Sequence, residues 1–161
     1  MENKFKSNIS IKSELFLILA SRAQHLEQVI KPSLLSGKWV ICSRFIDSTY
    51  AYQGDGRGID HKKISLFHHY ILDDFYPNFT ILFDLSVKES LKRLSFRKKL
   101  DFFEKENFYF FQKIRNSFLN QAKKNPQKYY IINAEYPINI IHKKLYSIVT
   151  KIINYFKFGG S

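Results

Sequence analysis

The sequence contains a single cysteine, Cys42, among its 161 residues. One cysteine cannot form a disulfide within the chain, and stable disulfides belong to oxidising compartments. Cys42 also stands in an apolar run, where a reduced thiol is expected to be buried. These features together predict a cytoplasmic protein.

Long hydrophobic runs are also missing. The longest candidate, the stretch LFLILA at residues 15–20, is too short to cross a bilayer, so no membrane partner is expected. The opening residues MENKFKSNIS contain no apolar core of signal-peptide length. The remaining length suits one domain, predicted over residues 1–158, and the closing residues 159–161 (GGS) are interpreted as a tag remnant.

Acidic residues are scarce, with 14 Asp and Glu against 26 Lys and Arg, so the formal net charge is +12. Such a charge predicts attraction to anions, namely nucleotide phosphates, nucleic acid or a membrane surface. Lys, Asn, Ile, Phe and Tyr are abundant throughout, so a general bias in composition explains the charge equally well. No long Lys/Arg run of the kind found in nucleic-acid-binding arms occurs, so nucleic acid is not the expected partner.

Apolar runs bounded by turn residues predict three strands, at residues 39–45, 79–86 and 129–134. Helical spacing of apolar residues predicts helices over residues 13–35, 61–73, 87–97, 103–124 and 138–156. Pro32 is expected to kink or end the first helix. Strands that alternate with helices predict an α/β fold with a parallel sheet flanked by helices.

Ligands of such sheets bind at the carboxyl ends of the strands, which directs attention to the residues after WVIC. Arg44 stands there, and Ser48, Thr49, Tyr52 and Gln53 follow it. An arginine can donate two hydrogen bonds to a phosphate, while an aromatic ring with an amide suits a nucleobase or a sugar. The pattern predicts a nucleoside monophosphate site. The alternative is that Ser48 and Thr49 cap a short helix and Tyr52 belongs to the core.

Two other candidates are weaker. The neighbouring residues His68 and His69 face different sides of a helix, and no cysteine or carboxylate lies at ligand spacing, so no metal site is expected. Asp84 follows a predicted strand and is expected to end it rather than to act as a base.

Four segments resemble bacterial thymidylate kinases: RAQHLEQVIKP, GKWVICSRFIDSTYAYQGDGRGID, FYPNFTILFDLSVKESLKR and LDFFEKENFYFFQKIRNSFL. The first two are similar to the substrate-binding segment of that family, and the last is similar to its lid and the helix after it. The resemblance covers residues 13–156. It implies a three-layer P-loop kinase-like fold, phosphorylation of dTMP to dTDP with ATP and Mg²⁺, and a homodimer.

The resemblance also implies roles for individual residues. Arg22 matches the arginine that hydrogen-bonds thymine, and Arg44 matches the one that contacts the monophosphate. Thr49 matches a residue at the thymine edge, and Tyr52 matches the tyrosine that packs on the deoxyribose and disfavours a 2′-hydroxyl. Ser48 and Gln53 complete this motif.

The lid is implied to lie at Arg97, Lys98 and Lys99, with Arg97 over the transferring phosphoryl group as a catalytic residue beside Arg44. Arg115 matches an arginine in the helix that follows the lid.

The chain departs from the family at several places. No G-x-x-x-x-G-K-[ST] loop for ATP phosphates occurs in it, so the resemblance implies a fold that lacks its first strand and helix. Ser43 replaces a family aspartate, Ile18 replaces an aromatic residue that stacks on thymine, and Phe102 replaces a lid arginine. We therefore expect a kinase that is impaired or inactive alone. The alternatives are a catalytically dead nucleotide-binding or subunit-like relative and a basic nucleic-acid-binding module.

Overall fold

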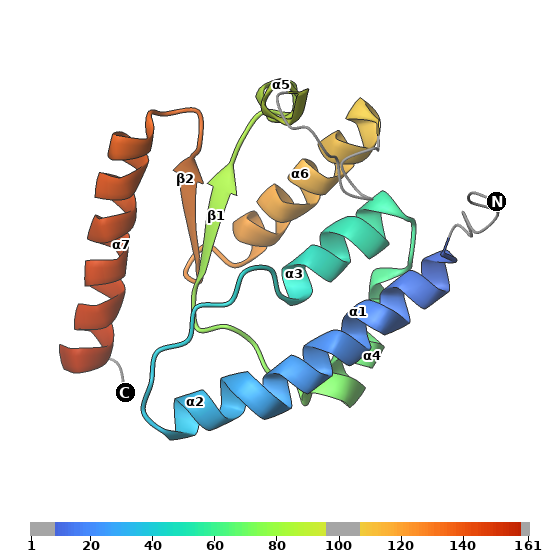
Figure 1. Ribbon diagram of the computed structural model, residues 1–161, viewed down its shortest axis with the longest axis horizontal. Helices are drawn as coiled ribbons and strands as arrows, with labels where there is room; N and C mark the ends of the chain where they lie inside the picture. Colours follow the sequence, from blue (N-terminus) through green and yellow to red (C-terminus); the bar gives the residue numbers. More distant parts are fainter. Residues whose placement is uncertain (1–8, 96–106, 159–161) are drawn as a thin grey trace, which may run out of the picture. The chain divides into compact units, whose positions relative to one another are not determined.

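The computed structural model describes residues 9–95 and 107–158 (Figure 1). The chain divides into two compact units, Met1–Tyr76 and Pro77–Ser161, called unit 1 and unit 2 below. The elements described in unit 1 are all helical, and unit 2 contains the sheet.

Unit 1 begins with a helical run made of α1 (Ile11–His25), η1 (Leu26–Ile30) and α2 (Lys31–Leu35). The Ser10 side chain caps it by accepting a hydrogen bond from the backbone N–H of Ser13 at 3.1 Å. The predicted helix is confirmed, and Pro32 does not end it. Proline offers no backbone N–H, and its ring clashes with the carbonyl four residues earlier in a regular α-helix. Here the turn before Pro32 is the π-helical η1, which ends at Ile30.

The strand predicted at residues 39–45 is wrong. Residues 39–42 have no regular secondary structure, and the Ile41 side chain is 99% exposed. A strand needs a neighbour that pairs with its N–H and C=O groups, and within the described ranges only β1 and β2 pair with each other. The apolar run correctly signals hydrophobic character, but it does not supply that partner.

The next elements of unit 1 are α3 (Ile46–Thr49), η2 (Tyr50–Gly56) and α4 (His61–Leu72). The alternative in which Ser48 and Thr49 cap a short helix is wrong, because both lie inside α3. Asp60 caps α4 through its carboxylate, which accepts from the Lys62 N–H at 2.8 Å.

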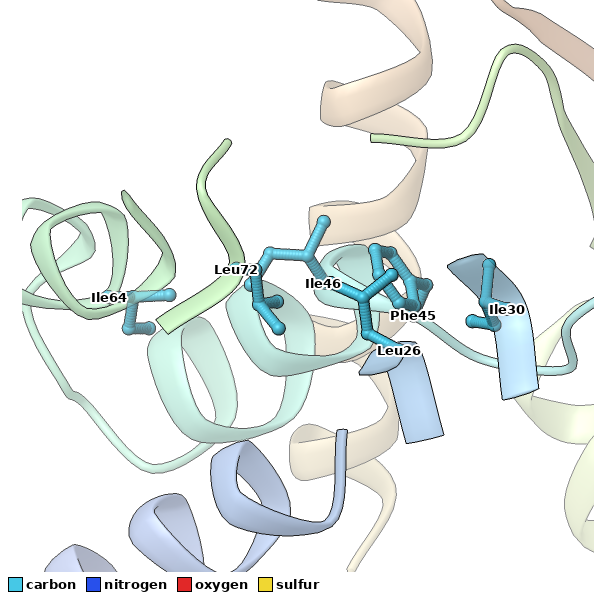
Figure 2. Close-up of a cluster of buried hydrophobic side chains, with 6 residues drawn as sticks. All are labelled: Leu26, Ile30, Phe45, Ile46, Ile64 and Leu72. Atoms are coloured by element: carbon cyan, nitrogen blue, oxygen red, sulfur yellow. The ribbon is translucent and has the colours of Figure 1, made fainter. Parts of the chain in front are cut away.

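The core of unit 1 joins these helices (Figure 2). Its buried side chains come from η1, from the start of α3 and from α4, and the six are Leu26, Ile30, Phe45, Ile46, Ile64 and Leu72. Leu26 and Ile46 are both 0% exposed. The core therefore fixes Phe45 and Ile46, which directly follow Arg44 in the chain, against the long helical run.

His68 on α4 is a fully buried polar residue of unit 1. Its Nε2–H donates to the Phe75 carbonyl at 3.2 Å, so Nδ1 is the acceptor for the Tyr76 hydroxyl, at 3.0 Å. Asp74 Oδ1 lies 3.9 Å from His68 Nδ1. Burial lowers the pKa of His68, although the hydrogen bond to Phe75 and the charge of Asp74 oppose the shift.

The buried imidazole predicts acid sensitivity. Because the folded state holds His68 with a lowered pKa, unfolding takes up a proton once the pH falls below about 6.5, the ordinary histidine pKa. The contribution of His68 to the free energy of unfolding should therefore be constant above that pH. Below it, this contribution should decline by at most about 1.4 kcal/mol per pH unit. Glutamine at this position keeps one hydrogen-bond donor and one acceptor but does not titrate. In His68→Gln, the free energy of unfolding measured with urea should therefore fall less steeply between pH 7 and pH 5.5.

His69 provides the matched control. Its hydrogen bond with the Asp74 carboxylate raises its pKa, so its contribution to stability is full below the unfolded pKa and is lost as the pH rises. His69→Gln should therefore steepen the acid decline. Equal slopes in the original protein and in His68→Gln would contradict the account.

Unit 2 contains two parallel strands, β1 (Thr80–Asp84) and β2 (Tyr129–Asn133), which pair from Thr80 opposite Tyr129 to Asp84 opposite Asn133. They confirm the second and third predicted strands. The chain between them forms α5 (Val87–Ser95) and α6 (Phe108–Lys124), and α7 (Ile138–Phe158) follows β2. Figure 1 shows α6 and α7 on the two sides of this sheet, and both contact β2.

The helices predicted from residues 61, 87 and 138 begin where expected. The helix predicted from residue 103 starts later, at Phe108, because the Asn107 side chain caps it by accepting from the Phe110 N–H at 3.0 Å. Across residues 9–95 and 107–158, none of the helices is both long and apolar enough to span a bilayer.

Candidate functional site

An open cavity of about 480 Å³ lies in unit 1, between α1 and the chain segment that leads into α3. Helix α1 contributes Leu17, Ile18, Ser21, Arg22 and His25. Residues 41–45 form the opposite wall. The cavity thus brings together two arginines, Arg22 and Arg44, that are 22 positions apart in the sequence.

Arg22 is held in a fixed orientation. Its Nη1 donates to Thr49 Oγ1 at 2.6 Å, and its guanidinium carbon lies 5.5 Å from the centre of the Phe45 ring. Burial lowers the pKa of Arg22, while Cys42 and Asp47 oppose the shift, and an arginine remains protonated at neutral pH. The fixed cation can therefore donate further hydrogen bonds to a ligand in the cavity.

Thr49 is fully buried and acts through this bond. It lies on α3, so the contact sets the distance between α3 and α1 at the cavity. In this structure Thr49 positions Arg22.

Arg44 has a left-handed backbone conformation, with φ of 62°. This conformation costs a residue with a side chain roughly 1 to 2 kcal/mol. The Cys42 thiol supports the turn by donating to the Arg44 carbonyl at 3.5 Å. Strained backbone at a residue with a functional side chain is a common feature of binding sites.

The Arg44 side chain extends along Tyr52 of η2. Its Nη2 donates to the Tyr52 hydroxyl at 3.1 Å, and its guanidinium carbon lies 4.8 Å from the ring centre. A cation over an aromatic face is stabilised by about 0.5 to 1 kcal/mol at an exposed site. The two contacts hold the Arg44 side chain, which lines the cavity, against the Tyr52 ring.

Ser48 and Gln53 point into the protein rather than to solvent, with exposures of 8% and 1%. The Gln53 Nε2 donates to Glu14 Oε1 at 2.7 Å, which links η2 to the first turn of α1. Glu14 was not among the residues expected from the sequence. The sequence feature that could have indicated a buried Glu14 is its position next to Leu15 and four residues before Ile18, on the apolar side of α1.

In unit 2, Arg115 on α6 is bound by Asp84 at the end of β1. Its Nε and Nη2 donate to the two carboxylate oxygens at 2.7 and 2.9 Å, and the hydrogen bond raises the pKa of Arg115. Such a bidentate pair orients the guanidinium. Asp84 therefore ends its strand and holds an arginine.

The lid residues Arg97, Lys98 and Lys99 lie outside the described residues. No group of three or more His, Cys, Asp or Glu residues that could hold a metal is found within the described part of the chain. Residues 9–95 and 107–158 thus offer no set of protein ligands for Mg²⁺, and no step is assigned to a metal here.

Comparison with known proteins decides the family. A family model described as thymidylate kinase matches residues 1–145. The chain belongs to the thymidylate kinase family. The thymidylate kinase of Pseudomonas syringae pv. tomato is 39% identical over 145 residues, which cover 90% of this chain and 69% of that protein. The thymidylate kinase of Alcanivorax borkumensis is 41% identical over 140 residues, covering 87% of this chain and 67% of that protein.

A crystal structure of the thymidylate kinase from Ehrlichia chaffeensis is similar in fold, with a TM-score of 0.68 and 34% sequence identity. The match covers 90% of this chain and 68% of that one. It confirms the predicted α/β fold of the P-loop kinase type with a parallel sheet flanked by helices.

Two of the departures from the thymidylate kinase pattern face the cavity. Ser43 and Ile18 are both among its lining residues. The third, Phe102, lies outside the described residues. An isoleucine offers apolar contact to a base but lacks the ring face, which adds about 0.5 to 1.5 kcal/mol in an aromatic pair.

Proposed function

We propose that unit 1 binds dTMP in the cavity between α1 and residues 41–45. The observation that supports this most is the convergence of Arg22 and Arg44 on one cavity, each held by a partner, Thr49 and Tyr52 respectively. Two fixed cations at a concave site suit a ligand with a carbonyl-bearing base and a phosphate dianion.

Each residue has a proposed role. Arg22 donates to the thymine ring and Arg44 binds the monophosphate. Tyr52 packs on the deoxyribose, where its ring leaves little room for a 2′-hydroxyl. Thr49 keeps Arg22 in place, and Ile18 covers the base from α1.

The reaction that fits this site and the family is transfer of the γ-phosphoryl group from ATP to dTMP, which gives dTDP. Catalysis of such transfers depends on positioning and on neutralising charge rather than on covalent chemistry. Arg44 serves both needs at the acceptor phosphate. The proposed donor-side residues are Arg97, Lys98 and Lys99, and Arg115 is proposed to support them.

We further propose that these 161 residues transfer phosphate poorly by themselves, because they contain no G-x-x-x-x-G-K-[ST] loop to hold the ATP phosphates. The test is dTDP formation from dTMP and ATP with Mg²⁺, followed by chromatography. Binding of dTMP with little dTDP would support both proposals. Turnover of about 1 per second or faster, the usual range for kinases, would establish the kinase activity and overturn the impairment.

A further inference from the structure

Glu14 is a buried carboxylate that does not line the cavity. It lies in the first turn of α1 and is 6% exposed. Its Oε1 accepts from Gln53 Nε2 at 2.7 Å, and its Oε2 lies 3.6 Å from Arg57 Nε. A carboxylate is expensive to bury unless it is paired and hydrogen-bonded, so these two partners are what make its position tolerable.

Both partners belong to the same short segment. Gln53 lies within η2, a π-helix of residues Tyr50–Gly56, and Arg57 is its C-terminal cap. The backbone N–H of Arg57 donates to the Tyr52 carbonyl at 2.9 Å, and that of Ile59 donates to the Gln53 carbonyl at 2.9 Å. A π-helix is a rare conformation that is often found at functional sites. Glu14 therefore ties this uncommon turn to α1 at two points.

Tyr52 lies immediately outside those two points, on the N-terminal side of Gln53. It precedes Gln53 directly, and its hydroxyl accepts the hydrogen bond from Arg44 Nη2. Any shift of η2 relative to α1 would move the Tyr52 ring relative to Arg44, which lines the cavity. The location of η2 thus determines the geometry of the Arg44–Tyr52 group.

We propose that Glu14 is a positioning residue: through Gln53 and Arg57 it holds η2 on α1, so that Tyr52 keeps the placement that excludes a 2′-hydroxyl. The proposal rests on the dTMP-binding function proposed above. It assigns Glu14 no contact with the nucleotide, and it predicts that losing Glu14 relaxes sugar discrimination more than it weakens binding.

The first test needs no nucleotide. Glu14→Ala removes the hydrogen bond from Gln53 to a charged carboxylate, which should loosen η2. Hydrogen exchange of the Arg57 and Ile59 backbone amides should therefore become about tenfold faster or more. Amides of α7 in unit 2 should exchange as before. Glu27→Gln is the control, because it removes a carboxylate on the same helical run that pairs with Lys31 at the surface, with 60% of the side chain exposed. Unchanged exchange at Arg57 and Ile59 in Glu14→Ala would overturn the proposed lock.

The second test measures sugar discrimination as the ratio of dissociation constants for ribothymidine 5′-monophosphate and dTMP. Glu14→Ala should lower this ratio by about fivefold or more, roughly the effect of one ordinary hydrogen bond. A general loss of folded protein would weaken both ligands equally and leave the ratio unchanged, which would contradict a positioning role. If the original protein does not bind dTMP, the proposed function is wrong, and the exchange test still decides whether Glu14 holds η2.

A swap of the carboxylate and the amide between Glu14 and Gln53 covers the case in which Glu14→Ala does not fold. Gln53→Glu places two carboxylates at hydrogen-bond distance and should raise exchange at Arg57 and Ile59 by about tenfold or more. The double variant Glu14→Gln/Gln53→Glu restores an amide facing a carboxylate and should recover protection. Failure of the double variant to recover any protection would contradict the proposal.

Discussion

Replacing Arg44 by asparagine is expected to weaken dTMP binding roughly 100-fold, which corresponds to about 2.7 kcal/mol. The proposed role of Arg44 is a bidentate contact with the monophosphate, and hydrogen bonds to charged groups contribute about 1.5 to 3 kcal/mol each. Asparagine tolerates the left-handed backbone conformation found at this position, with φ of 62°, so it removes the guanidinium without adding strain. Calorimetric titration with dTMP measures the effect.

Two variants make the Arg44 result specific. Arg44→Lys keeps the charge but cannot fork two hydrogen bonds, so we expect an intermediate loss of about tenfold. Arg93→Asn removes one positive charge from unit 2, where Arg93 pairs with Glu89 on α5, and should leave dTMP affinity unchanged. Equal losses in Arg44→Asn and Arg93→Asn would show that net charge rather than the cavity attracts the nucleotide.

Replacing Leu26 by alanine is expected to destabilise unit 1 by about 3 kcal/mol, within the usual range of 2 to 5 kcal/mol for a buried leucine. Leu26 is 0% exposed and lies in the core that fixes Phe45 and Ile46, next to Arg44 in the chain (Figure 2). Total stabilities are typically about 5 to 15 kcal/mol, so the change is a large fraction. Urea unfolding followed by the fluorescence of Trp39, the single tryptophan, reports on unit 1.

Leu35→Ala is the matched control for the core. Leu35 ends the same helical run and is 88% exposed, so the same truncation should cost less than about 0.5 kcal/mol. A small effect of Leu26→Ala, similar to that of Leu35→Ala, would contradict the described core.

The parts of the fold that follow from local pattern were predictable. The strands β1 and β2 are short runs of β-branched and aromatic residues that follow proline, and α4 begins at a capping aspartate, Asp60. Each of these signals acts within a few residues, so the sequence alone contains it.

Features that depend on distant partners were not predictable in the same way. Residues 39–42 have the composition of a strand, but pairing depends on a neighbour that composition does not name. The left-handed conformation of Arg44 has no sequence signal, because arginine does not favour it. The pairing of Glu14 with Gln53 spans 39 positions and emerges only when α1 packs against η2.

The candidate site was likewise predictable only in part. The resemblance to thymidylate kinases names Arg22, Arg44, Thr49 and Tyr52, and the structure adds how they are held. Thr49 accepts from Arg22, and Tyr52 accepts from Arg44. These contacts turn a set of expected residues into a geometry in which each cation has a fixed direction.

The most direct test of the proposed function is calorimetric titration of the protein with dTMP, using dGMP as the control nucleotide. Saturable 1:1 binding of dTMP and much weaker binding of dGMP are expected, because the proposed roles give Arg22 to the thymine base and Arg44 to the monophosphate. Equal affinity for the two nucleotides, or no binding of dTMP, would contradict the assignment of the unit 1 cavity as a dTMP site.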